Sequence, residues 1–315
     1  MINLFLSRSL EKKIIYQILI MKKLVLAFLV VSYFSLQNIF GQAQTLTYGF
    51  KAGLSLSKID GPSEMSGGTT LEVNDNANGF FVGALFRYWF TDLIGVKWEL
   101  LYSQKGTDYN FNGPGYQLLP TETGATLNIT GNQRINLNIS NSYFDIPVLL
   151  YGKFGKFEVE GGVNIGFLIA STATGELGFN DGRSQAGSPI DNFIATLDYK
   201  YRKDNPGEVD FGLGTTTINV DGTPNNIPRI LQAYYQFPED RGSYFSTIDF
   251  GLNVGAYYYW NQGLFLGGRL NYGLTDVTKD NYDVSKVELD GSGNFIPRTD
   301  KDRNISLQFS IGFSF

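Results

Sequence analysis

The sequence predicts an all-β protein, an eight-stranded antiparallel up-and-down transmembrane β-barrel with long extracellular loops. Apolar and polar residues alternate within segments of about ten residues, as in strands with one apolar and one polar face. The connections between these segments are alternately long and short. Charged residues make up only 17% of the chain and aromatic residues 15%, which fits a protein that turns much of its surface toward lipid.

Residues 1–43 are predicted to be a signal peptide with an N-terminal extension. From Met21 the chain has two lysines, then an apolar stretch, and then small residues that indicate cleavage near Ala43. The alternative is a transmembrane anchor, but a spanning helix needs about 20 apolar residues, more than this stretch offers. The start codon is either Met1 or Met21. Residues 44–315 are expected to form the barrel domain.

Eight candidate strands follow from the period-two pattern. They lie at residues 47–57, 79–90, 95–106, 142–154, 156–170, 244–260, 263–275 and 304–315. Long loops are expected near residues 58–78, 107–141, 171–243 and 276–303. Short turns join the other strand ends, and in outer-membrane barrels such turns face the periplasm. An even number of strands places both ends of the barrel domain on that side.

The alternation also assigns charged side chains to the inside of the barrel. An eight-stranded barrel has room inside only for side chains, so these residues are expected to form a polar network that fills the interior. A proton or ion path through the same residues is the alternative. The inward set contains Lys51, Arg87, Lys97, Glu99, Lys105, Asp145, Glu158, Glu160, Asp249 and Arg269.

Aromatic residues gather beside the short turns. Trp89, Trp98 and Trp260 lie there, and so do the three tyrosines at 257–259. Tyrosine and tryptophan favour the boundary between lipid and water because each has an apolar body and a polar tip. We therefore expect a periplasmic aromatic girdle at this end.

The composition excludes several kinds of chemistry. The chain has no Cys and no His, so disulfides, thiol chemistry, most metal sites and histidine-dependent triads are excluded. Glu158 and Glu160 could form an acid–base pair, but nothing indicates a sugar cleft beside them. We expect neither enzymatic activity nor a cofactor.

Two acidic segments in the last expected loop contain residue types that bind calcium. They are DNYD at residues 280–283 and DKDRN at residues 300–304. Neither has the glycine and the distal glutamate of the twelve-residue calcium loop. They are interpreted as solvated acidic loops, and no metal site is predicted. The net charge of −5 argues against nucleic acid as a partner.

Several segments resemble the PorT-like outer-membrane β-barrel family of Gram-negative bacteria. The most specific are WELLYSQKG and YFDIPVLL, supported by YGFKAGLSLS, GFFVGALFRYWF and the final FSIGFSF. The resemblance implies a C-terminal signal that is read by the barrel-assembly machinery. That signal would be carried by Phe315, supported by Phe313 and Phe309. One member of the family takes part in protein secretion, which raises a secretion partner as an alternative.

The expected function is that of a non-enzymatic integral protein of the cell outer membrane, with a structural or surface-interaction role. One alternative is a subunit of a secretion or envelope assembly, which would bind a protein partner. Another is a narrow, porin-like channel or a binder of small ligands. The expected surroundings are outer-membrane lipid, and the sequence names no specific ligand or partner.

Overall fold

The computed structural model of the chain describes residues 46–261 and 263–315. The predicted signal peptide, residues 1–43, and its cleavage near Ala43 lie outside these residues. Within the described part, no helix is long and apolar enough to cross a membrane. The long elements in this part of the chain are strands.

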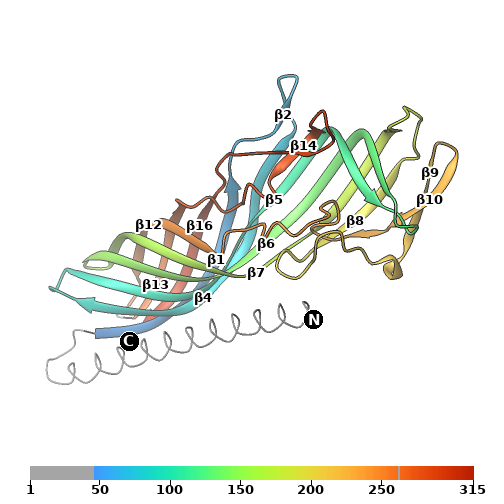
Figure 1. Cartoon of the computed structure of the whole chain (residues 1–315). Coiled ribbons are helices and arrows are strands. Elements are labelled where there is room, and N and C mark those ends of the chain that lie inside the picture. The colour runs from blue at the N-terminus through green and yellow to red at the C-terminus, as the bar shows by residue number, and fades with distance from the viewer. Residues whose placement is uncertain (1–45, 262) are drawn as a thin grey trace, which may run out of the picture. The chain divides into compact units, whose positions relative to one another are not determined.

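Eight long strands form a closed ring, which confirms the predicted barrel (Figure 1). The order around the ring is β1-β4-β5-β6-β7-β12-β13-β16, and β16 pairs again with β1. The strands are β1 (Leu46–Asp60), β4 (Glu72–Trp89), β5 (Ile94–Pro120), β6 (Thr126–Phe154), β7 (Phe157–Ser184), β12 (Ile248–Tyr259), β13 (Leu264–Gly273) and β16 (Arg303–Ser314).

The seam of the barrel joins β1 to β16. Phe309 lies opposite Leu54 of β1 and opposite Gly268 of β13. The amide of Phe315 donates to the carbonyl of Tyr48 at 2.8 Å, and the two rings are 5.3 Å apart. Lipid offers no hydrogen-bonding groups, so an open edge would leave backbone groups unsatisfied at several kcal/mol each. The seam removes both edges of the sheet.

The two ends of the barrel differ in their connections. At one end, which we call the turn end, residues 90–93 join β4 to β5 and residues 155–156 join β6 to β7. Gly155 has a φ of 61°, a left-handed conformation that glycine adopts without strain. The opposite end carries the long connections and is called the loop end.

Three strands continue well past the segments predicted from the sequence. β5 runs to Pro120, β6 begins at Thr126 and β7 ends at Ser184. The expected loop at 107–141 is therefore mostly a β-hairpin, which corrects the prediction. The alternation persists there with polar residues outward, so it lacks the outward apolar pattern that marks a membrane strand.

Short elements complete the loop end. β8 pairs antiparallel with the outer part of β7, and β11 pairs parallel with β8. The elements are β2 (Met65–Ser66), β3 (Thr69–Thr70), β8 (Phe193–Tyr199), the 3₁₀-helix η1 (Phe211–Leu213), β9 (Thr215–Val220), β10 (Thr223–Pro228), β11 (Ile230–Leu231), β14 (Val284–Leu289) and β15 (Phe295–Pro297).

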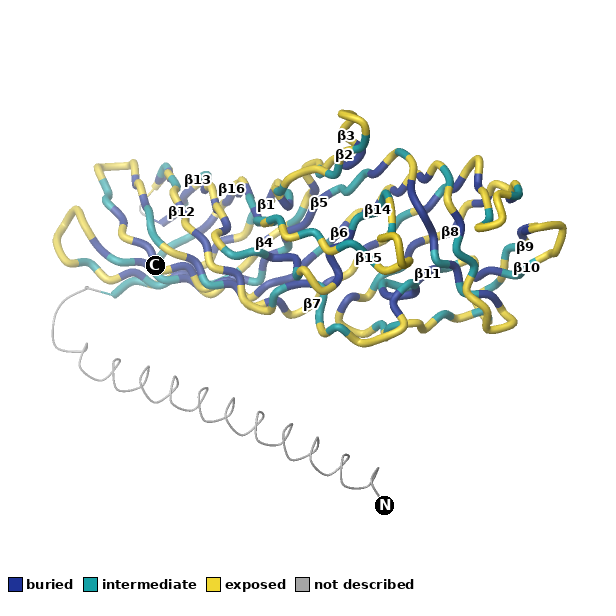
Figure 2. The backbone as a smooth tube through the Cα atoms, turned by 45° about the horizontal axis from the view of Figure 1, so that its top comes forward, coloured by how far each residue is buried: buried dark blue, intermediate teal, exposed yellow. Residues whose placement is uncertain are grey.

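Buried and exposed positions alternate along the strands (Figure 2). In the barrel the exposed positions are apolar, as at Leu54, Leu100 and Val163, and the buried ones are often polar. At the loop end the order is reversed, and a cluster that includes Phe111 and Leu177 is buried. The chain thus has a polar interior where lipid surrounds it and an apolar interior at the loop end.

A β-bulge lies near the change from one interior to the other. Ser142 of β6 pairs with Ala170 of β7, but Tyr143 pairs with Leu168, so Ile169 is an extra residue. One extra residue shifts the alternation of β7 by one position. Buried positions are even-numbered up to Leu168 and odd-numbered from Ser171 to Phe179.

A lysine on the lipid-facing side should destabilise the barrel. We expect Leu252→Lys to lower the free energy of unfolding by about 2–4 kcal/mol, because Leu252 faces outward near the middle of β12 and a charge there meets hydrocarbon. Urea unfolding in phospholipid vesicles measures this. The control is Leu213→Lys, in exposed η1 at the loop end, where little change is expected. Equal effects of the two substitutions would contradict a lipid-facing Leu252.

Candidate functional site

The barrel interior contains ten charged side chains, which we call the lumen cluster. They come from seven strands of the ring, and each residue is at most 4% exposed. Five are basic and five acidic, so their formal charges balance. The members are Lys51, Arg87, Lys97, Glu99, Lys105, Asp145, Glu158, Glu160, Asp249 and Arg269, the same residues that the sequence placed inward.

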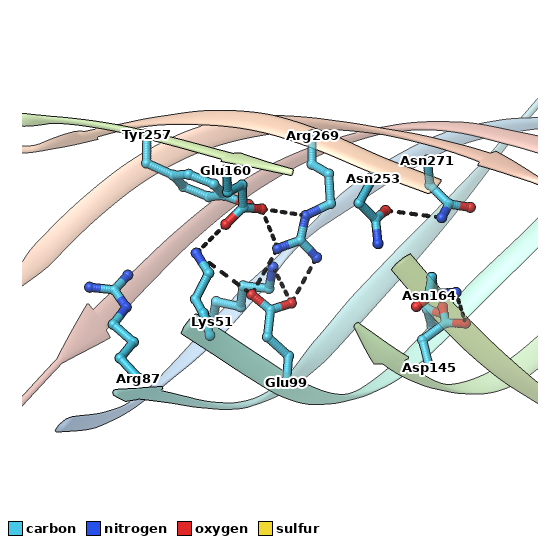
Figure 3. Close-up of polar contacts among 12 residues, drawn as sticks. Lys51, Arg87, Glu99, Asp145, Glu160, Asn164, Asn253, Tyr257, Arg269 and Asn271 are labelled. Atoms are coloured by element: carbon cyan, nitrogen blue, oxygen red, sulfur yellow. Dashed lines mark hydrogen bonds and ion pairs between the residues drawn. The ribbon is translucent and has the colours of Figure 1, made fainter. Parts of the chain in front are cut away.

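Arg269 of β13 lies at the centre of the cluster (Figure 3). Its Nη1 and Nη2 are 2.7 and 2.8 Å from the two carboxylate oxygens of Glu99, a two-pronged geometry that fixes both groups. Its Nε donates to Glu160 at 2.7 Å. Lys51 is a further partner of Glu99, at 2.8 Å. Four strands, β1, β5, β7 and β13, are thus joined across the lumen.

Lys97 and Glu158 extend this network toward the turn end. Lys97 Nζ is 2.9 Å from Glu158 and also contacts Glu160. Arg87 lies 3.4 Å from Glu158. Tyr259 donates its hydroxyl hydrogen to Glu158 at 3.0 Å. Each carboxylate in this region therefore has more than one donor, as buried charges require.

A second group lies around Lys105. Lys105 Nζ is 3.0 Å from Asp145 and 3.5 Å from Asp249. Asn164 donates to Asp145 at 3.0 Å, and Asn304 of the closing strand donates to Asp249 at 2.9 Å. These amides supply the hydrogen bonds that the single lysine cannot give to both carboxylates.

Two tyrosines expected in the aromatic girdle lie inside the barrel instead. Tyr257 donates to Glu160 at 2.9 Å, and Tyr259 donates to Glu158. Both are at most 3% exposed. The signal that identifies them is the alternation itself, because outward positions at Ala256 and Tyr258 place Tyr257 and Tyr259 inward.

The tryptophans expected in the girdle divide between the two faces. Trp260 is 69% exposed at the turn end, and Trp98 stacks with Phe86 on the outward phase of its strand. Trp89 lies two residues from inward Arg87, and its ring is 4.9 Å from Tyr151, which is only 2% exposed. Trp89 is therefore on the inward phase, unlike Trp98 and Trp260, with which it was expected to share the girdle.

The proposed assembly residues lie on the outward face of β16 and at its end. Phe309 is 51% exposed and Phe315 is 61% exposed. The ring of Phe313 is 5.1 Å from that of Phe315.

The acidic segments of the last loop were expected to be solvated, but several of their carboxylates are paired or buried. Arg298 Nη1 lies 2.7 Å from Glu72, and Arg298 Nη2 lies 2.6 Å from Asp300. Asp283 is buried, with Arg298 Nη1 at 3.9 Å. The segments meet because residues 276–302 fold back over the end of β4, a contact that no local pattern encodes. Among the described residues, no group of three acidic side chains has the arrangement of a metal site.

Burial sets the protonation of these loop-end carboxyls. It raises the pKa of Asp283 to about 8, helped by the hydrogen bond with Asp300 and the charge of Asp302, although Arg298 opposes the shift. The pKa of Asp302 and the pKa of Glu72 are also raised, in each case chiefly by burial.

Sequence comparison identifies the family. The chain matches the family described as outer membrane protein beta-barrel domain over residues 42–279, and it belongs to that family. It is therefore an outer-membrane β-barrel protein. No curated protein matches the sequence.

Three solved structures are similar to the chain at low identity. Ail of Yersinia pestis is 9% identical, with a TM-score of 0.33 and coverage of 86% of this chain and 100% of Ail. OprG of Pseudomonas aeruginosa is 10% identical, with a TM-score of 0.34 and coverage of 85% and 95%. Neisserial surface protein A is 10% identical, with a TM-score of 0.31 and coverage of 86% and 100%.

Removing one carboxylate from the lumen cluster should destabilise the barrel. We expect Glu99→Gln to cost about 3–5 kcal/mol, because it leaves Lys51 and Arg269 buried without their shared partner. Lys58→Gln is the control, since Lys58 and Asp60 form an exposed pair worth at most about 1 kcal/mol. Urea unfolding in phospholipid vesicles measures the free energy of unfolding of both variants. Equal stability of Glu99→Gln and the wild type would contradict a tightly paired lumen.

The packing of the loop end should weaken as the pH rises through about 8. The folded pKa of Asp283 lies above its ordinary value of 3.8, so its contribution to stability is complete below about pH 4 and lost as the carboxyl ionises. Urea unfolding of the loop end, followed by the near-ultraviolet signal of its tyrosines, measures this between pH 6 and pH 9. Asp283→Asn should flatten the dependence. A wild-type midpoint that does not change with pH would contradict this assignment.

Proposed function

We propose that the protein is a non-enzymatic outer-membrane barrel that closes its own lumen and presents a folded surface at the loop end, with a structural or surface-interaction role. One observation carries the proposal. The ten charged side chains of the lumen cluster pair with one another, and each residue is at most 4% exposed. Charged side chains that are buried and paired in this way fill the lumen and obstruct a path for a solute.

The loop end supports the surface role. It is built on the extended β5–β6 hairpin and the outer part of β7, and it has an apolar core of its own. Tyr116 of β5 donates to the carbonyl of Ser285 in β14 at 2.9 Å, so the last loop is tied to the hairpin. In outer-membrane barrels the short turns face the periplasm, which directs this folded part to the cell exterior.

Export and assembly form part of the proposal. Residues 1–43 would direct the chain across the inner membrane, with cleavage near Ala43. The exposed aromatic end, Phe309, Phe313 and Phe315, would be read by the barrel-assembly machinery, as the resemblance to PorT-like barrels implies.

The same resemblance favours one second candidate, a subunit of a secretion or envelope assembly. WELLYSQKG and YFDIPVLL, which carry the resemblance, lie in β5 and β6. Crosslinking in intact envelopes, followed by purification of the barrel, tests this candidate. Recovery of one stoichiometric protein partner would favour an assembly subunit over an independent surface protein.

Purified protein in planar bilayers should show no ion conductance, because the charged side chains of the lumen cluster are buried and paired across the lumen. The double variant Glu99→Ala with Arg269→Ala removes the central pair and should produce small conductance steps. Heat-modifiable gel mobility confirms in parallel that each sample is a folded barrel. Regular conductance steps in the wild type would overturn the closed-lumen proposal and favour the narrow channel.

A further inference from the structure

A layer of uncharged polar side chains, which we call the polar layer, lies along the lumen between the Arg269 network and the Lys105 group. On β16 the inward positions of this layer run from Asn304, which donates to Asp249, through Ser306 to Gln308, which lies opposite Arg269. The members of the layer are Ser55, Asn141, Asn253, Asn271, Asn304, Ser306 and Gln308, and each is at most 6% exposed.

One polar atom on each of these side chains, and one oxygen of Asp249, has no hydrogen-bond partner within the described part of the chain. These eight atoms are Ser55 Oγ, Asn141 Nδ2, Asp249 Oδ1, Asn253 Nδ2, Asn271 Oδ1, Asn304 Oδ1, Ser306 Oγ and Gln308 Oε1. A buried polar atom left unbonded lowers the ratio of folded to unfolded protein by a factor of about 5 or more. Eight such losses would approach the whole folding equilibrium constant of a typical small domain. These atoms therefore need partners that the described residues do not supply.

The register places several of these side chains next to each other on the wall of the lumen. Ser55 lies directly opposite Gln308, and Ser306 lies directly opposite Asn271. The Cβ atoms of such pairs are about 4.5–5.5 Å apart, a distance that a small molecule bonded to both side chains can bridge. Asn271 donates to Asn253 at 3.0 Å beside Arg269 (Figure 3), and this bond leaves the other amide atom of each residue unused.

The charges of the lumen indicate a neutral ligand. The five basic and five acidic side chains of the lumen cluster already balance, so a bound ion would leave an uncompensated charge away from water. Six of the unpartnered atoms are oxygens and two are amide nitrogens, so the ligand both donates and accepts hydrogen bonds. Water has these properties, and a buried water makes about three hydrogen bonds, so eight atoms correspond to about three waters.

We propose that the polar layer binds a cluster of about three water molecules between the Arg269 network and the Lys105 group. The waters donate to Gln308 and Asn271 and accept from Asn253, and they join the two charged groups through one hydrogen-bonded network. Because the ligand is neutral, the lumen stays closed to ions while part of it is hydrated. The inference deepens the proposed closed lumen and rests on it only in keeping these waters from free exchange with the solvent.

Solution NMR of the folded protein in detergent micelles detects such waters directly. We expect rotating-frame Overhauser cross-peaks between water and the side-chain amides of Asn253 and Asn141, with the sign that marks proximity rather than proton exchange. Gln133 is the control, because it is also buried and its Nε2 donates to the carbonyl of Lys286 at 2.7 Å. The side-chain amide of Gln133 should give no such peak.

The substitution Ser306→Ala distinguishes a hydroxyl that binds water from one that is unsatisfied. If Ser306 Oγ binds water, its removal loses a hydrogen bond, and the midpoint of urea unfolding should fall. If the hydroxyl has no partner, its removal relieves a penalty, and the midpoint should rise. Ser292→Ala, in an exposed turn, is the control and should leave the midpoint unchanged. Heat-modifiable mobility shows that each variant is folded.

Each of several results would overturn the proposal. They are the absence of water peaks at both Asn253 and Asn141, a higher midpoint for Ser306→Ala than for the wild type, and a wild-type midpoint that falls when tetramethylammonium replaces sodium at constant ionic strength. The last result would assign the polar layer to a bound cation. The bilayer experiment is independent, because a conducting barrel with the water peaks would overturn only the closed lumen, and a silent barrel without them would overturn only the bound waters.

Discussion

The need to satisfy every backbone hydrogen bond in lipid governs this structure. Because hydrocarbon cannot replace a missing partner, the sheet must close on itself, and β16 meets β1. Closure with apolar side chains outward leaves the polar half of each strand inside. The lumen cluster follows from that geometry, since charges with no access to water must find each other. Arg269 with Glu99 and Lys105 with Asp145 are the result.

Most of the membrane barrel could be predicted from the sequence, because lipid imposes a simple local rule. Val159 points outward and its neighbour Glu160 points inward, and such alternation can be recognised without any knowledge of partners. The alternation also places Trp89 inward, and it was the aromatic character of this residue that wrongly suggested a position in the girdle. At the loop end the rule does not apply, since the outward side chains there meet water.

The buried carboxyls of the last loop could not be predicted from sequence for a different reason. Asp283 is buried because Arg298, Asp300 and Asp302 lie around it, and Arg298 in turn binds Glu72. Glu72 is more than 200 residues away in the chain. A contact of that span leaves no trace in local composition. One continuous sheet thus contacts lipid along one part and water along the other. Only the lipid-facing part has an alternation of apolar and polar residues that can be recognised from the local sequence.

The seam between β1 and β16 imposes an order of events on folding. The strand that emerges first must wait for the strand that emerges last, because each forms one side of the same ladder. Until then the chain carries alternating apolar side chains in water, a condition that favours aggregation. Pairing of the first and last strands of the ring is therefore the step that ends this exposure.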